Sequence, residues 1–167
     1  MYERLIQRAK LVSAIAPQGA QEAGDIIGNI IDRYAAAPAQ PQGITAYTAI
    51  KDSAGVYQSA VLGIATGKAT GSPTAQSLTY KVQSGNAGDG SDMADIPASA
   101  YIDSDGSSAA VQAITADDTS KYIGVNLAGC GRYVRVVAAL AFTDGTAPSQ
   151  FVSAFMALGD GNGNPVS

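Results

Sequence analysis

The chain of 167 residues has the length of one domain and is long enough to bury a core without disulfides. Charged residues make up only 14% of it, and 10 basic against 14 acidic residues leave a net charge of −4. This acidic balance argues against nucleic acid as a partner, because phosphate binding requires a basic surface. No apolar run has the length of a membrane span or a signal peptide, so we expect no membrane partner and assembly in a cytoplasm.

The first 23 residues show the spacing of a short helix. Leu5, Ala9, Val12 and Ala16 would share one helical stripe, and Pro17 would end the helix. The alternative is an extended arm that becomes ordered on a neighbouring molecule, since a short isolated helix is marginal without packing. Residues 1–23 are therefore predicted to form an arm or short helix, and residues 24–167 a single β-domain.

From residue 24 onward the signals favour short β-strands separated by turns. The predicted strand segments are 25–34, 44–52, 56–67, 77–84, 109–115, 121–129, 132–142 and 150–160. The last two form an apparent hairpin joined by the polar turn "TDGTAPS". Seven or eight strands at this spacing indicate a β-sandwich or barrel.

Alternation of side chains in these segments predicts which ones face the core. The sequence "SLTYKVQS", for example, places Leu78, Tyr80 and Val82 on one side and Thr79, Lys81 and Gln83 on the other. The expected core residues are Leu78, Tyr80, Val82, Ile123, Val125, Leu127, Val134, Val136, Phe151 and Phe155.

Few residues are available for catalysis or for binding a cofactor. The chain has no histidine, which removes the common catalytic triads, and its two glutamates, Glu3 and Glu22, both lie near the N-terminus. A hydrolase would have to gather aspartates such as Asp92, Asp95, Asp103 and Asp105 in one cleft. We expect no enzyme and no cofactor.

The motifs that suggest a metal are weak. The sequence "DSDGS", residues 103–107, begins like a calcium loop, but its glycine stands at the fourth position and Ile114 replaces the bidentate glutamate. The single cysteine, Cys130, cannot form an intramolecular disulfide and is predicted to be a small buried filler.

Three segments of the chain look like parts of a known protein family. They are "YERLIQRAKLVSAIAPQ" at the start, "LTYKVQSGNAGDGSDMADIP" in the middle, and "YIGVNLAGCGRYVRVVAALAFTDGTAPSQFVSAFMALGD" near the end. Together they resemble the small head-decoration, or capsid cement, proteins of tailed bacteriophages. The resemblance covers most of the chain from about Leu78 onward, and these motifs belong to the fold framework.

The resemblance implies a jelly-roll-like β-sandwich that binds the outer surface of an icosahedral head as a homotrimer. It implies the major capsid protein as partner and a role in stabilising the shell against internal pressure. We expect the N-terminal residues Arg4, Leu5, Arg8 and Leu11 to contact the capsid or a neighbour, the alternative being a surface helix packed on its own sandwich. A tail, spike or fibre-associated domain that adheres to host surface glycan is the alternative function.

Overall fold

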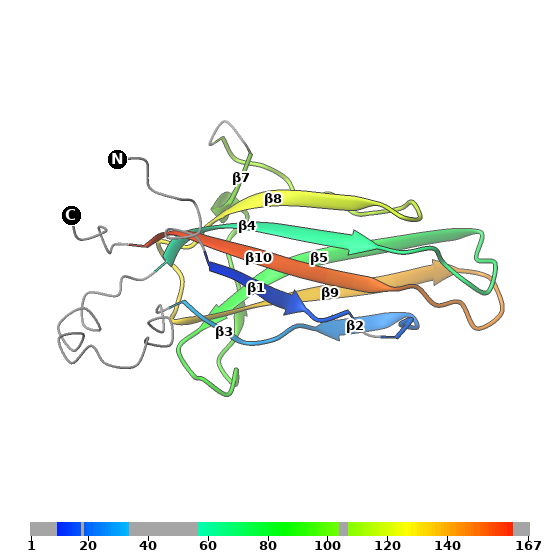
Figure 1. Ribbon diagram of the computed structural model, residues 1–167, viewed down its shortest axis with the longest axis horizontal. Coiled ribbons are helices and arrows are strands. Elements are labelled where there is room, and N and C mark those ends of the chain that lie inside the picture. Colours follow the sequence, from blue (N-terminus) through cyan, green and yellow to red (C-terminus); the bar gives the residue numbers. More distant parts are fainter. Residues whose placement is uncertain (1–9, 18, 34–56, 104–106, 162–167) are drawn as a thin grey trace, which may run out of the picture.

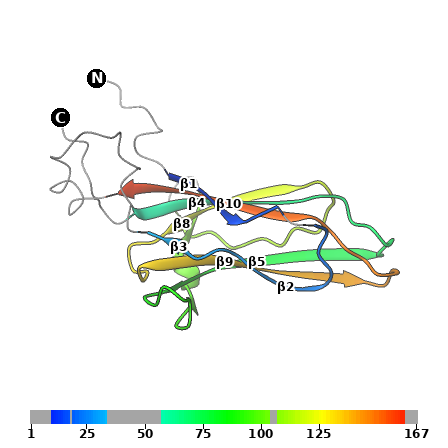
Figure 2. The same cartoon turned by 60° about the horizontal axis from the view of Figure 1, so that its bottom comes forward.

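The protein is an all-β sandwich, as the sequence predicts. The structure is a computed structural model that describes residues 10–17, 19–33, 57–103 and 107–161. Two antiparallel sheets pack face to face along the long axis of the molecule (Figures 1 and 2). Apart from one short 3-10 helix, Ala98–Ala100, the regular elements of these residues are strands. Within the same residues, no helix reaches the length and apolarity needed to cross a bilayer.

The first sheet has the strand order β1-β10-β4-β8-β7. Its strands are β1 (Lys10–Ile15), β10 (Val152–Gly161), β4 (Tyr57–Thr66), β8 (Ser120–Asn126) and β7 (Tyr101–Ile102). The second sheet has the order β2-β9-β5-β6, and the short β3 also pairs with β9. Its strands are β2 (Gly24–Ile27), β9 (Tyr133–Thr143), β5 (Ala75–Gly85), β6 (Ala94–Asp95) and β3 (Ile31–Asp32). Each sheet is therefore centred on one long antiparallel pair, β4 with β10 and β5 with β9.

The core lies between the sheets and confirms most of the predicted inward residues. The confirmed ones, all buried, are Leu78, Tyr80, Val82, Ile123, Val125, Leu127, Val134 and Val136. Phe151 and Phe155 were expected in the core and are instead 53% and 49% exposed. The inward positions of β10 are held by Val152, Ala154, Met156 and Leu158, so the two rings project from the opposite side.

The last two strands do not form the predicted hairpin with each other. β9 lies in the second sheet and β10 in the first, so residues 144–151 cross from one layer to the other. The physical reason is that each strand has one fully apolar face, and these faces are buried by packing toward each other across the sandwich. Gly71 and Gly145, both with positive φ, let the two crossing connections approach closely, and Thr146 N donates to Gly71 O at 2.8 Å.

The predicted N-terminal helix is wrong over the residues that the structure describes. Lys10–Ile15 is strand β1, paired with β10 from Lys10↔Leu158 to Ile15↔Ala154. Pairing with β10 satisfies the backbone hydrogen-bonding groups of β1. It also buries Ala14 and Ile15, which an isolated helical turn would leave exposed. The sandwich therefore includes residues before position 24.

Two other predicted strands have different outcomes. Residues 109–115 contribute a single bridge, Leu78↔Ile114, instead of a strand. The predicted strand at 44–52 lies outside the described residues.

Two buried polar groups tie the sheets together. Arg33, 2% exposed, follows β3 and donates to the carbonyl oxygens of Tyr57, Cys130 and Gly131. Tyr101 of β7 accepts the backbone N–H of Val82, on β5 of the other sheet, at 2.8 Å. Because buried polar groups must be hydrogen-bonded, both contacts fix how the two layers meet.

Candidate functional site

The outer surface of the first sheet is the candidate site. Antiparallel pairing of β1, β10, β4 and β8 brings alternate residues of each strand to the side away from the core. We call this surface the uncharged face. It is made of Leu11 and Ser13; Ser153, Phe155, Ala157 and Gly159; Ser59, Val61, Gly63 and Ala65; and Ser120, Tyr122, Gly124 and Asn126. None of these positions carries a charge.

The register of the sheet aligns these residues in rows across the strands. In one row Leu11 pairs with Ala157, Ala157 with Val61, and Val61 with Gly124. In the next row Ser13 pairs with Phe155, Phe155 with Gly63, and Gly63 with Tyr122. The rows place four large apolar or aromatic side chains within two residues of one another along the strands.

The ring of Phe155 lies over Gly63. It occupies the space that a side chain at Gly63 would need, which explains the glycine at the centre of β4. An aromatic ring that covers a cross-strand glycine protects the backbone beneath it. The ring still leaves half of its surface in solvent, so the packing uses only one side of it.

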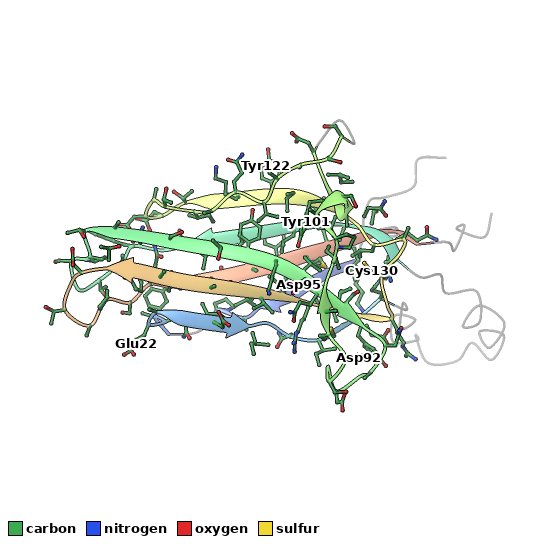
Figure 3. All side chains as sticks on the ribbon, turned by 180° about the vertical axis from the view of Figure 1, so that it is seen from behind. Glu22, Asp92, Asp95, Tyr101, Tyr122 and Cys130 are labelled. Atoms are coloured by element: carbon green, nitrogen blue, oxygen red, sulfur yellow. The ribbon has the colours of Figure 1, made fainter. Side chains whose placement is uncertain are left out.

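The exposed fractions on this face are unusually large for apolar side chains in a sheet. Leu11 is 70% exposed, Val61 46%, Phe155 49% and Tyr122 81%. Single exposed apolar residues are common, but neighbouring ones mark interaction surfaces. Figure 3 shows Tyr122 on the outer side of β8, away from the core.

A hollow adjoins Tyr122. It has a volume of about 750 Å³ and is lined by Val61, Tyr122, Gly124 and Ala157, by the charged residues Asp103 and Lys121, and by Ile102 and the segment around Gln112. Small residues at Gly124 and Ala157 leave this space open beside a large ring. The face is therefore uneven, with a protruding side chain next to a depression.

The predicted contact residues fall partly on this face. Leu11 is outward-facing on the edge strand β1, whereas Arg4, Leu5 and Arg8 lie outside the described residues. Val61 and Tyr122 were not among the predicted contact residues, and Phe155 was predicted to lie in the core. The alternation of "KYIGVN" already placed Tyr122 opposite Ile123 and Val125, so that signal was available in the sequence.

Two of the aspartates considered for hydrolysis, Asp92 and Asp95, have structural partners, and Asp105 lies outside the described residues. Asp92 accepts the backbone N–H groups of Asn86 and Ala87, and these bonds lower the pKa of its carboxyl. Asp95 is bonded to Lys81 and Gln83, which likewise lower its pKa. Both carboxyls are therefore ionised at neutral pH, and neither suits a general acid. Figure 3 shows Asp92 in the loop that follows β5 and Asp95 beside β5.

The described residues contain no group of three or more His, Cys, Asp or Glu side chains that could hold a metal ion. The middle of the "DSDGS" segment, residues 104–106, lies outside the described residues. Cys130 is half-buried and packs against the core, with its thiol free.

Comparisons of the chain with models of protein families, with curated proteins and with solved structures find no match.

Proposed function

We propose that this chain is a virion structural protein that decorates the outer surface of an icosahedral phage head and stabilises it. The observation that carries the proposal is the uncharged face, on which Leu11, Val61, Phe155 and Tyr122 stand exposed side by side. A protein partner can cover such a surface without removing any ion from water, so the usual cost of burying charge does not arise. The resemblance to capsid cement proteins suggests the icosahedral phage head as the assembly to which the chain binds.

In this role the sandwich acts by binding in many copies. The partners are the major capsid protein and further copies of this chain, arranged as a homotrimer as the resemblance implies. Many weak contacts repeated by symmetry hold a shell more firmly than any one of them does alone. The acidic net charge is compatible with a location on the capsid exterior, away from the packaged nucleic acid.

Co-sedimentation with mature heads that lack this protein tests the proposal. We expect saturable binding, a fixed number of copies per head, and a higher temperature of head disruption when the protein is bound. Bovine serum albumin at the same concentration controls for trapping in the pellet. If the folded protein stays in the supernatant at every concentration, the decoration role is wrong.

A second candidate function is adhesion to host surface glycan as part of a tail, spike or fibre. The observation that favours it is the 81% exposed ring of Tyr122 beside the hollow, because an exposed aromatic face can stack on a sugar ring. Binding to a glycan array that is lost in Tyr122→Ala, with no binding to heads, would favour adhesion over decoration.

A further inference from the structure

We propose that the open edge of β8 takes up a single extended, proline-free segment of a partner protein, which adds to the first sheet as a strand beside Ser120 and Tyr122. The inference goes beyond the proposed function, because it holds for any assembly to which the chain belongs. Three features of the described residues support it: unpaired backbone groups, a hollow that runs round the edge, and a hydroxyl group without a partner in that hollow.

The strand β7 covers only part of the edge of β8 (Figure 1). Its two residues pair with Val125 and Gly124, and within the described part of the chain no strand pairs with residues 120–123 on that side. Four residues at about 3.3 Å each leave an open edge of about 13 Å. Open strand edges are templates for pairing with another chain.

The ladder between β4 and β8 fixes which backbone groups of this edge are open. Leu127 N donates to Gln58 O, and in an antiparallel ladder the residues that bond to one neighbour alternate with those that face the other side. The odd-numbered residues of β8 therefore bond to β4, and the N–H and C=O groups of Ser120 and Tyr122 point away from it. Among the described residues these groups have no hydrogen-bond partner.

The hollow beside Tyr122 runs round this edge. It is lined by Tyr122 and Ala157 from the outer side of the first sheet, and by Ile123 and Tyr80 from the core side. Residues from the segment 109–112 line its remaining wall. Successive side chains of a strand point to opposite sides of the sheet, so a strand laid along β8 would direct them alternately to these two sides. The hollow therefore has room for both sets of side chains of an added strand.

Tyr80 brings a polar group into the hollow. This residue lies on the core side of β5 and is only 6% exposed, so its ring and hydroxyl reach the hollow at the edge of the other sheet. Among the described residues the hydroxyl has no hydrogen-bond partner. Polar groups in protein interiors are almost always hydrogen-bonded. A polar group of the bound segment would supply the missing partner.

The surroundings of the edge favour a single extended segment over a folded partner. A strand that belongs to a folded sheet carries its own neighbour about 4.8 Å further out, and residues from the segment 109–112 already stand on that side of the hollow. A flat protein surface or a glycan lacks the row of alternating donors and acceptors that an open strand edge requires. Lys121 and Asp103 give the hollow both signs of charge, which favours a segment without strong net charge.

Selection from a displayed library of random heptapeptides tests the inference, with the full chain as bait and its Ser120→Pro variant as the negative bait. Proline at this position removes an outward N–H and leaves the ladder to β4 intact, because that donor does not face β4. We expect peptides with apolar residues at alternate positions, bound about tenfold or more tightly by the wild type than by the variant. Their binding should slow amide hydrogen exchange at Ser120 and Tyr122.

The matched control is Ile27→Pro. Gly28 N donates to Val136 O, so by the same alternation the N–H of Ile27 points away from β9, at the edge of the second sheet. This variant should bind the selected peptides like the wild type. Thermal unfolding of both proline variants checks that a lost contact does not reflect a lost fold.

N-methylation of a selected peptide gives a result that needs no variant of the protein. Methyl groups on every second nitrogen should abolish binding in one register and change it by less than about twofold in the other, because only alternate N–H groups of an added strand face β8.

Three results would overturn the inference. The first is a selection in which no peptide prefers the wild type to Ser120→Pro, and the second is an effect of N-methylation that does not alternate along the peptide. The third is self-association of the free chain that Ser120→Pro abolishes, because a second copy would then occupy the edge. Binding of the wild type to heads is measured separately, so the decoration role can stand or fail independently of these results.

Discussion

The two outer faces of the sandwich obey the same backbone rules and differ in charge. Antiparallel sheets with one face on the core usually show polar residues on the other, and the second sheet does so. Its outward positions include Asp25, Lys81, Asp95 and Arg135, while the corresponding positions of the first sheet carry no charge. The difference therefore lies in the side chains and not in the backbone.

The second face satisfies its own polar groups. Lys81 Nζ lies 2.8 Å from Asp95 Oδ2, Gln83 Nε2 donates to Asp95 Oδ1 at 2.7 Å, and Arg135 Nε donates to Gln83 Oε1 at 2.8 Å. Such cross-strand pairs are stable in contact with water. The first face combines exposed apolar side chains such as Leu11 and Phe155 with uncharged polar ones such as Ser59.

The largest expected loss of stability comes from a charge placed in the core that both sheets share. Val136 is fully buried on β9, so Val136→Asp should cost several kcal/mol and unfold the protein, because the carboxylate has no partner there. Urea denaturation followed by circular dichroism measures the loss. Ala141→Asp, on the outward side of the same strand, is the control and should stay near wild-type stability.

Removing the buried arginine should loosen the connection between the sheets. Arg33→Met leaves the carbonyl oxygens of Tyr57, Cys130 and Gly131 without this donor, at a cost of about 2 to 4 kcal/mol. The midpoint of urea unfolding reports the change. Arg33→Lys keeps a donor and should lose less, so equal loss in the two variants would show that these hydrogen bonds contribute little.

A smaller effect is expected from the hydroxyl that joins β7 to β5. Tyr101→Phe leaves the buried N–H of Val82 without its acceptor and should cost about 1 to 2 kcal/mol. Tyr122→Phe, which removes an exposed hydroxyl, should change the free energy of unfolding by less than about 0.5 kcal/mol. Similar losses in both variants would contradict the bridging role of Tyr101.

The smallest expected effect is a pH dependence of stability that arises from Asp95, on the second sheet. Hydrogen bonds from Lys81 and Gln83 lower the pKa of Asp95 below the ordinary 3.8. The contribution of Asp95 to the free energy of unfolding is therefore fully present above pH 3.8 and is lost as the pH falls through the lowered pKa. The pair is about half exposed, so Asp95→Asn should cost no more than about 0.5 kcal/mol at neutral pH.

Thermal unfolding of the wild type and Asp95→Asn across the acidic range measures this difference. The two curves should converge in acid, where the carboxyl is protonated in both the folded and the unfolded wild type. A difference that persists in acid would mean that the aspartate stabilises the sheet by something other than its charge.

The sequence by itself determined the all-β class and the inward sides of β5, β8 and most of β9. In "SLTYKVQS" one side is apolar and the other polar, so only one orientation buries the apolar side and the register follows from the alternation. Leu11 was also predicted as a contact residue, but for a helix or arm that the described residues do not form. Its place on the uncharged face came from the pairing of β1 with β10.

The tertiary structure alone decided the orientation of β10, the separation of β9 from β10, and the composition of the candidate site. In "QFVSAFMALGD" both sides carry large apolar residues, so alternation could not tell Phe151 and Phe155 from Val152, Ala154 and Met156. The choice depends on the chain beside it, because Gly63 of β4 and Gly67, which follows β4, leave room for the two rings on the outer side. Val61, Phe155 and Tyr122 become neighbours only through the order of the sheet, which is a long-range property that no local pattern encodes.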